Sequence, residues 1–407
     1  MAVRPIASPP AAATPNRVEE EDLSKVSGYV STRGIRRARS SWRPVTAGID
    51  RFAGAVFILP AVIVILGFSI FPLLASLYVS LTRLQFVAGG VELRFVGLNN
   101  YAKLLVGIDH EHFLGLAGPL NPVSIAVLAA GYAALGFFLF RYLRGPSRTL
   151  GGLFGRLVAV VGAGALLWLV VTTVMTSGRP GTLVVTLVYV GVDVTVQYLL
   201  ALGLALLVVQ HLPGRRFFRV VFLLPMMITP VGVAYLFQML TNTSIGPLYP
   251  LWARLGLTDV SWVTNAWGAR LAVMIGDVWQ WTPFIFIVLL AAIETLPHEL
   301  VEAAVVDGAN RWQVFWRITF PLILPASSTV VLIRLIEGFK IIDLPNVLTN
   351  GGPGIATESL TLHSFIAWRT LDLGGSAAVA YMLLFVSTVA AVSFFNFVII
   401  PQRRARA

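Results

Sequence analysis

Long apolar runs separated by short polar segments dominate this sequence. A helix that crosses a membrane needs about 20 consecutive, mostly apolar residues. Eight stretches meet this requirement, near residues 52–81, 122–140, 153–176, 183–209, 217–240, 271–293, 322–342 and 377–400. Prolines interrupt several of them, which neighbouring helices can tolerate because they satisfy the freed backbone groups. The pattern predicts an all-α, polytopic membrane protein with about eight transmembrane helices.

Composition leads to the same class. Of 407 residues, 57% are hydrophobic and only 12% are charged, whereas soluble domains carry about 25% charged residues. A water-soluble fold cannot bury so much apolar surface, so a soluble protein is excluded. Cysteine is absent, which also excludes disulfides and cysteine-ligated metal sites.

The net charge of +11 reflects membrane topology and not nucleic-acid binding. Lys and Arg are concentrated in alternate connecting segments, and the remaining connections are poor in them. Because basic loops stay in the cytoplasm, this bias predicts that both ends of the chain, and the loop at residues 298–325, are cytoplasmic. We expect a multi-pass protein of the bacterial inner membrane.

The chain is expected to divide into five regions. Residues 1–50 lack an apolar core and are rich in Pro, Ala and Ser, which is typical of a disordered tail, here a basic one. Residues 51–120 hold the first span and an outer loop, and residues 121–177 form an extra transmembrane hairpin that is nearly free of polar residues. Residues 178–400 form the main body, and residues 401–407 form a cytoplasmic tail.

The polar stretch at residues 298–325 predicts two short helices joined at a glycine. Pro297 can open the first helix, and Gly308 suits its end because glycine adopts the left-handed conformation without a Cβ penalty. Asn310 can cap the second helix, with Gln313 three residues later in the capping-box position. Pro321 follows at the passage into the next apolar run.

Sequence motifs for catalysis are missing. No G-x-x-x-x-G-K-[ST] phosphate loop, H-E-x-x-H or G-x-S-x-G is present. The segment Asp109-His110-Glu111-His112 could bind a metal, but adjacent residues converge poorly on one ion. We therefore interpret it as a solvated loop and expect no metal site, no cofactor in this chain and no enzymatic activity.

Ionisable and amide residues within apolar spans are candidates for function. The candidates for a translocation path are Arg334, Glu337, Lys340, Asp277, Gln280 and Asp193. The first three follow at i, i+3 steps, which places them on one helix face where they can pair. Such a face can line a polar path, or it can be a salt-bridged stripe against a partner helix. Asp193 and Asp277 can each face a cavity or only a neighbouring helix.

The polar stretch resembles a known family signature. It reads Glu302-Ala303-Ala304, then Asp307-Gly308-Ala309, then Ile318, then Phe320-Pro321. This order closely resembles the EAA motif of permease subunits of bacterial ABC importers, with phenylalanine where the family usually has leucine. The resemblance implies that seven residues couple the permease to an ATPase. They are Glu302, Ala303, Ala304, Asp307, Gly308, Ile318 and Pro321.

Other segments resemble the carbohydrate members of that family, the maltose, multiple-sugar and glycerol-phosphate type. They are F-V-G-L-N-N-Y at residues 95–101, G-R-R-F-F-R at residues 214–219 and L-T-N-G-G-P at residues 348–353. The resemblance implies a core of six transmembrane helices, to which the hairpin at residues 121–177 is added. It also implies a second, different permease subunit, two cytoplasmic ATPase subunits that bind ATP and Mg²⁺, an extracytoplasmic substrate-binding protein and a carbohydrate or polyol substrate.

An alternative is an ion-coupled secondary transporter. Asp193, Asp277 and Glu337 could carry protons or ions in such a protein. An inverted repeat with broken central helices would favour this alternative, but the sequence shows no convincing repeat. In both cases the surroundings are lipid, and nucleic acid is not expected as a partner.

Overall fold

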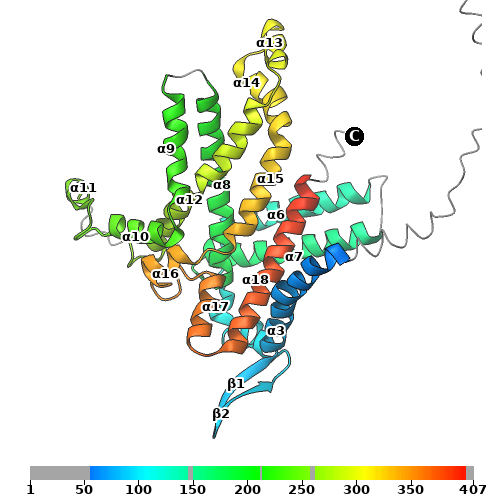
Figure 1. Ribbon diagram of the computed structural model, residues 1–407, viewed down its shortest axis with the longest axis vertical. Helices are drawn as coiled ribbons and strands as arrows, with labels where there is room; N and C mark the ends of the chain where they lie inside the picture. The colour runs from blue at the N-terminus through cyan, green and yellow to red at the C-terminus, as the bar shows by residue number, and fades with distance from the viewer. Residues whose placement is uncertain (1–55, 145–149, 211–212, 257–261, 400–407) are drawn as a thin grey trace, which may run out of the picture. The chain divides into compact units, whose positions relative to one another are not determined.

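The structure, a computed structural model, describes residues 56–144, 150–210, 213–256 and 262–399 (Figure 1). The chain divides into two compact units, Met1–Ile70 and Phe71–Ala407. In the first unit, residues 56–65 are α-helical and lead into the π-helix η1 (Leu66–Ile70). The expected tails at residues 1–50 and 401–407 lie outside the described residues.

Within the described residues, seven helices are long and apolar enough to cross a membrane. They are Val56–Ser80, Pro122–Leu143, Gly151–Val174, Thr182–Val209, Ala266–Glu294, Arg311–Gly338 and Leu373–Ile399. Each overlaps one of the runs predicted from the sequence, so the prediction of an all-α, polytopic membrane protein is confirmed. The helix Arg311–Gly338 begins earlier and ends earlier than the predicted run at residues 322–342.

The span predicted at residues 217–240 is not one continuous helix. Helices α9 (Arg215–Met227) and α10 (Pro230–Thr241) replace it and are bent by 97° at a short break. Ile228 is extended, and Thr229 caps α10 by accepting a hydrogen bond from the Gly232 amide. A residue that precedes proline is biased away from helical geometry, which explains why the helix stops before Pro230. If the bent pair is counted as one span, the total is the expected eight.

Three helices form the centre of the second unit: α8 (Thr182–Val209), α12 (Ala266–Glu294) and α15 (Phe320–Gly338). Helices α8 and α12 pack along each other, and α15 packs against both. Ala201 and Ala205 of α8 are fully buried there. Small side chains let helix backbones approach closely, which is how membrane helices gain packing energy. The large buried side chains of this cluster include Ile285, Phe286, Leu289, Leu290 and Ile323.

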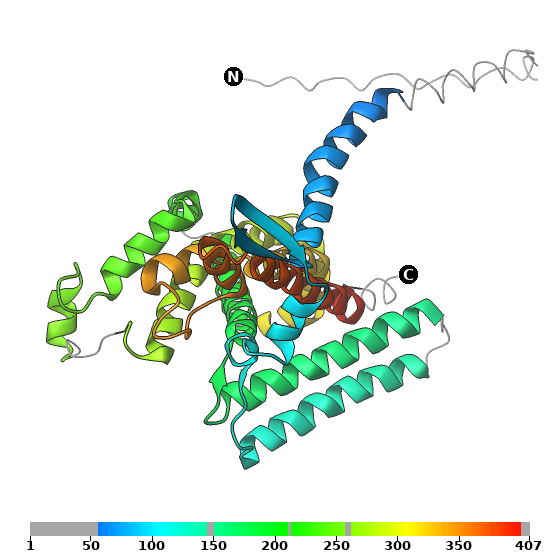
Figure 2. The same cartoon turned by 90° about the horizontal axis from the view of Figure 1, so that it is seen from below.

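Helices α6 (Pro122–Leu143) and α7 (Leu150–Val174) are the two helices expected for the inserted hairpin. Figure 2 shows them side by side, and the Tyr132 hydroxyl of α6 donates a 3.0 Å hydrogen bond to the Gly164 carbonyl of α7. Asn121 and Ser124 form a capping box at the start of α6. Helix α7 also packs against α8 and against α18 (Leu373–Phe394), which continues into the π-helix η3 (Phe395–Ile399).

Short strands in the connecting segments were not expected from the sequence. Strands β1 (Thr82–Val87) and β2 (Gly90–Phe95) pair antiparallel, with Val87 opposite Gly90. Strands β3 (Gly115–Leu116) and β4 (Arg179–Pro180) form a second small pair. The remaining short helices outside the polar stretch are α3 (Phe71–Ser80), α4 (Asn99–Leu105), α5 (His110–Phe113), α11 (Tyr249–Arg254), α16 (Asp343–Thr349) and α17 (Leu360–Arg369).

Within the second unit, the β1–β2 hairpin and α13 (His298–Val306) lie at opposite ends (Figure 1). The segment at residues 95–101 follows this hairpin, and α13 belongs to the polar stretch at residues 298–325. The two signature segments are therefore separated by the helix bundle, as the sequence-based topology requires.

Candidate functional site

The polar stretch begins with α13, which carries Glu302, Ala303 and Ala304 within one turn. Gly308 follows with φ of +84°. Its amide donates to the Val305 carbonyl at 3.0 Å, and the Ala309 amide donates to the Ala304 carbonyl at 2.9 Å. These two bonds are the Schellman motif, which needs a left-handed residue at this position. The predicted role of Gly308 as a helix terminator is confirmed.

The predicted capping box is also present. The Gln313 amide donates to Asn310 Oδ1 at 2.8 Å, and the Asn310 amide donates to Gln313 Oε1 at 2.9 Å. Helix α14 (Arg311–Val314) begins here, but it does not end as a separate short helix. It continues through the π-helix η2 (Phe315–Thr319) into α15, so the second helix of the polar stretch is the start of a transmembrane helix.

The wide turn η2 has a local cause. Pro321 has no amide hydrogen and its ring would clash with the carbonyl four residues earlier in a regular helix. The Phe320 amide donates to the Phe315 carbonyl, five residues back, directly before this proline. Ile318 lies within the wide turn and is half-buried.

The polar stretch itself carries several exposed apolar side chains. Val306 is 86% exposed and Trp312 is 68% exposed. The rings of Trp312, Phe315, Trp316 and Phe320 contact one another, with centroids 5.0–6.2 Å apart. Exposed apolar clusters rimmed by polar residues mark interaction sites. Glu302, Asp307 and Gly308 are exposed on the same segment.

A buried polar triad lies at the centre of the bundle. Arg334 of α15 forms an ion pair with Asp277 of α12 and donates from Nε to Gln197 Oε1 of α8 at 2.8 Å. Gln197 Nε2 in turn donates to Asp277 Oδ2 at 2.8 Å. All three side chains are almost completely buried. Gln197 was not singled out from the sequence, although a single amide within an apolar run is a visible signal.

A cavity of about 140 Å³ opens beside the triad. Its walls include five of the six residues that the sequence suggested for a translocation path, namely Arg334, Glu337, Lys340, Asp277 and Gln280. Gln280 Nε2 donates to the Ile228 carbonyl at 3.3 Å, so α12 contacts the break between α9 and α10. Pro230 and Asp343 also line the cavity, and burial raises the pKa of the Asp343 carboxyl.

The three charged residues at i, i+3 spacing do not all pair with one another. Helix α15 ends at Gly338, so Lys340 lies beyond it, and Lys340 Nζ pairs with Glu337 Oε1 at 2.7 Å on the exposed side. Arg334 points to Asp277 instead. Three residues advance a helix by 300°, so a stripe at i, i+3 spacing rotates around the helix and separates its first and last members.

Asp193 lies apart from this cavity. It is 2% exposed, and its Oδ1 has no hydrogen-bond partner among the described residues. The residue lines a larger, mostly apolar cavity of about 700 Å³ between α8, α9 and α12, together with Trp279 and Phe286. Trp281, by contrast, lies under the Arg334 guanidinium, 5.0 Å from ring centroid to Cζ.

The segment Asp109–His112 is only partly a solvated loop. Glu111 is exposed, but His112 Nε2 donates to Glu358 Oε1 at 3.0 Å and its ring stacks on His363. The hydrogen bond to Glu358 raises the pKa of His112, whereas burial lowers the pKa of His363 to about 4. The partners of His112 could not be recognised from the sequence, because they lie about 250 residues away from it.

Two of the three remaining signature segments, at residues 95–101 and 348–353, have structural explanations. Asn100 Nδ2 donates to the carbonyls of Ser80 and Thr82 at 2.8 and 2.9 Å, which fixes α4 against the end of α3. In the other segment, Asn350 adopts a left-handed conformation with φ of +51° and ends α16. The Arg270 side chain of α12 then holds the following turn through the Ala356 carbonyl at 2.7 Å.

Comparison with known families decides what the chain is. Residues 197–405 match the family described as "binding-protein-dependent transport system inner membrane component". The chain belongs to this family. It is a permease subunit of a binding-protein-dependent ABC transporter and a multi-pass inner-membrane protein. The match includes the polar stretch at residues 298–325 and all three residues of the buried triad.

Individual relatives agree with the family. The trehalose/maltose transport system permease protein MalF of Thermococcus litoralis is 34% identical over 198 residues, which is 49% of this chain and 67% of the relative. The sn-glycerol-3-phosphate transport system permease protein UgpA of Escherichia coli O157:H7 is 34% identical over 211 residues, which is 50% of this chain and 70% of the relative. Among solved structures, a bacterial alginate ABC transporter chain matches with a TM-score of 0.52 at 18% identity, covering 88% of this chain and 95% of that chain. That match shows a shared fold.

Proposed function

We propose that this permease forms half of the translocation path for a carbohydrate or polyol and that residues 298–325 couple the path to a cytoplasmic ATPase. One observation carries the proposal: the polar stretch directly connects the two helices that hold the buried ion pair. Helix α12 bears Asp277 and ends at Glu294, and α15 bears Arg334. A displacement of the stretch therefore acts on both charged residues at once.

The connection is short and stiff. The helix Arg311–Gly338 runs without interruption from the polar stretch to Arg334, a distance of roughly 35 Å at about 1.5 Å per residue. On the other side, Arg219 of α9 pairs with Glu294 at 2.6 Å, close to the start of the stretch. A rigid helix transmits a movement at one end to the other, as in the rigid-body transitions of packed domains.

The exposed surface of the stretch supports docking to a partner. Glu302 and Asp307 offer negative charge, and Val306 and Trp312 offer apolar area. We propose that the partner is an ATPase that binds ATP and Mg²⁺, because this chain has no phosphate loop of its own. The chain itself is then not an enzyme. Ala303, Ala304, Ile318 and Pro321 would position this surface on α13 and at the start of α15.

The rest of the assembly follows from the family. We propose two ATPase subunits, a second and different permease subunit, and an extracytoplasmic substrate-binding protein that delivers the substrate to the end of the molecule opposite α13. We propose that the polar stretch and both chain ends are cytoplasmic, which the charge bias of the sequence supports. The names of the relatives support maltose, trehalose and glycerol 3-phosphate as substrates to test first.

Reconstitution tests this proposal. The chain is purified from its native membranes with the subunits that co-purify, identified by mass spectrometry and reconstituted in proteoliposomes. Uptake of a radiolabelled sugar is expected to require ATP and the binding protein. Uptake by this chain alone, driven by an ion gradient, would refute the proposal and favour the ion-coupled alternative, for which the buried Asp193 side chain is the motivating feature.

A further inference from the structure

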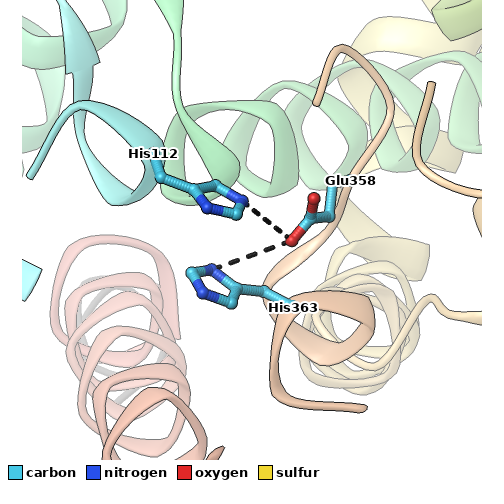
Figure 3. Close-up of side chains that lie close together, drawn as sticks. All are labelled: His112, Glu358 and His363. Atoms are coloured by element: carbon cyan, nitrogen blue, oxygen red, sulfur yellow. Dashed lines mark hydrogen bonds and ion pairs between the residues drawn. The ribbon is translucent and has the colours of Figure 1, made fainter. Parts of the chain in front are cut away.

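A His–Glu–His cluster lies outside the proposed translocation path and coupling surface (Figure 3). His112 comes from α5, Glu358 from the turn between α16 and α17, and His363 from α17. His112 Nε2 lies 3.0 Å, and His363 Nδ1 3.9 Å, from the same oxygen, Glu358 Oε1. Figure 3 shows that both imidazole rings turn a nitrogen toward this carboxylate. No step of the proposed transport mechanism uses these side chains.

We propose that this cluster binds a divalent transition-metal ion, with Zn²⁺ as the occupant that its donors fit best. Two imidazole nitrogens and one carboxylate oxygen are a common set of three protein ligands for zinc, which leaves a fourth position for water. The absence of cysteine is no obstacle to such a site. Because His112 lies about 250 residues from Glu358 and His363, no local sequence motif contains all three ligands.

The distances suit an ion. Zinc bound at about 2.0–2.2 Å holds neighbouring tetrahedral ligand atoms roughly 3.4 Å apart. The measured 3.0 and 3.9 Å fall on either side of this value, and all three ligand atoms lie within 4.8 Å of one another. The two rings are stacked with an interplanar angle of 9°, and an ion lies near the plane of each imidazole that binds it, so one ring must tilt. His112 is half-buried on a helix of four residues and is the freer of the two.

The surroundings hold the other two ligands in place. Glu358 and His363 are 4% and 9% exposed. The turn before Glu358 is fixed by hydrogen bonds from Arg270 to the Ala356 carbonyl and from the Tyr189 hydroxyl to the Thr357 carbonyl. One hydrogen bond must be given up, since the Thr182 hydroxyl lies 3.1 Å from His363 Nδ1. Arg270 and Tyr189 therefore support the site, because groups that orient a metal ligand raise the affinity for the metal.

The cluster is also accessible. His112 lines a cavity of about 800 Å³ whose walls include Asp109, Glu111 and Arg179. This cavity gives an ion an entry route and leaves room for a water ligand. The carboxylates of Asp109 and Glu111 raise the local concentration of cations at its wall. A bound ion would join α5 to α17 across 250 residues of sequence and so stabilise the end of the second unit that carries the β1–β2 hairpin.

Zinc binding is tested on the full-length protein, purified in detergent through a tag without histidines and stripped with a chelator. Zinc is titrated in competition with a fluorescent indicator, and thermal midpoints are measured with and without zinc. We expect one ion per chain and a higher midpoint with zinc, because a ligand that binds only the folded state stabilises it. Co²⁺ in place of Zn²⁺ is expected to give the visible absorption bands of a four-coordinate nitrogen and oxygen site.

His112→Ala is the decisive variant, because His112 is half-buried and its loss leaves the fold intact. Zinc affinity is expected to fall at least tenfold. Removing a group that only supports a metal ligand already lowers metal affinity about 10–100-fold, and His112 would itself be a ligand. His110→Ala, on the same helix and outside the cluster, should bind zinc like the wild type. Glu358→Gln tests the carboxylate, with elution on size exclusion as the check on folding. The proposal is overturned if the wild type binds no zinc, or if His112→Ala binds it as tightly as His110→Ala does.

Discussion

Gly308 offers the sharpest test of the proposed coupling stretch. Its φ is +84°, and a Cβ added to it would meet no atom within 4 Å. Gly308→Val therefore creates no clash, and its cost is backbone strain alone. That strain is about 1–2 kcal/mol for an L-residue in the left-handed region. For a β-branched residue such as valine the cost is near the upper value, because these residues rarely adopt the left-handed conformation.

The strain shifts the equilibrium between the left-handed turn at residue 308 and other backbone conformations. The two hydrogen bonds of the Schellman motif, at Gly308 and Ala309, require the left-handed turn. A cost of 1–2 kcal/mol lowers the population of that turn by a factor of about 5–30. We expect ATP-driven uptake in proteoliposomes, and transport-stimulated ATP hydrolysis, to fall by a similar factor. Insertion and thermal stability should remain, since none of the nine residues of α13 is buried within the described chain.

Gly256→Val is the matched control. Gly256 has φ of +67° and, like Gly308, has no atom within 4 Å of an added Cβ, but it follows α11 and lies outside the coupling stretch. This variant should carry the same local strain and transport normally. Normal uptake by Gly308→Val, or an equal loss in both variants, would show that the turn at Gly308 does not transmit the ATPase movement.

Three further outcomes test the site. Glu302→Lys should reduce co-purification of the ATPase several-fold, whereas Glu299→Lys, one turn earlier on α13, should reduce it less; equal effects would mean a nonspecific charge effect. Asn310→Ala should cost about 1 kcal/mol of local stability by removing the capping box, seen as faster amide exchange in α14, and unchanged exchange would contradict this. Asp277→Leu should destabilise the protein by about 3–5 kcal/mol because it leaves a buried arginine unpaired. Adding Arg334→Met should recover part of that loss, measured by thermal unfolding. Additive losses in the double variant would show that the two side chains do not interact.

Much of the fold could be predicted from the sequence, because the lipid environment imposes simple rules. Every transmembrane helix must satisfy its own backbone groups and cover about 20 residues, so apolar runs reveal the spans directly. Local capping was equally visible. The hydrogen bonds of Asn310 and Gln313 and the left-handed Gly308 depend only on neighbouring residues.

What the sequence could not reveal depends on contacts between distant segments. The bend at Ile228 follows from two prolines that were visible, but a 97° angle is set by packing and by the hydrogen bond from Gln280. Arg334 could equally have paired along its own helix, and only the packing of α12 beside α15 selects Asp277. Local spacing says nothing of a partner such as His363, whose proximity to His112 arises from the tertiary fold.

The buried triad also restricts how the proposed movement can occur. Breaking the pair between Arg334 and Asp277 would leave charges unpaired in a water-poor interior, at about 3–5 kcal/mol. Gln197 ties the same pair to α8 through hydrogen bonds of 2.8 Å. Helices α8, α12 and α15 should therefore move as one rigid block when the coupling stretch is displaced. The deformable part lies at the edge of this block, at the break between α9 and α10 that Gln280 contacts. We infer that access to the path changes by rotation of this block against the partner subunit, with the triad intact throughout.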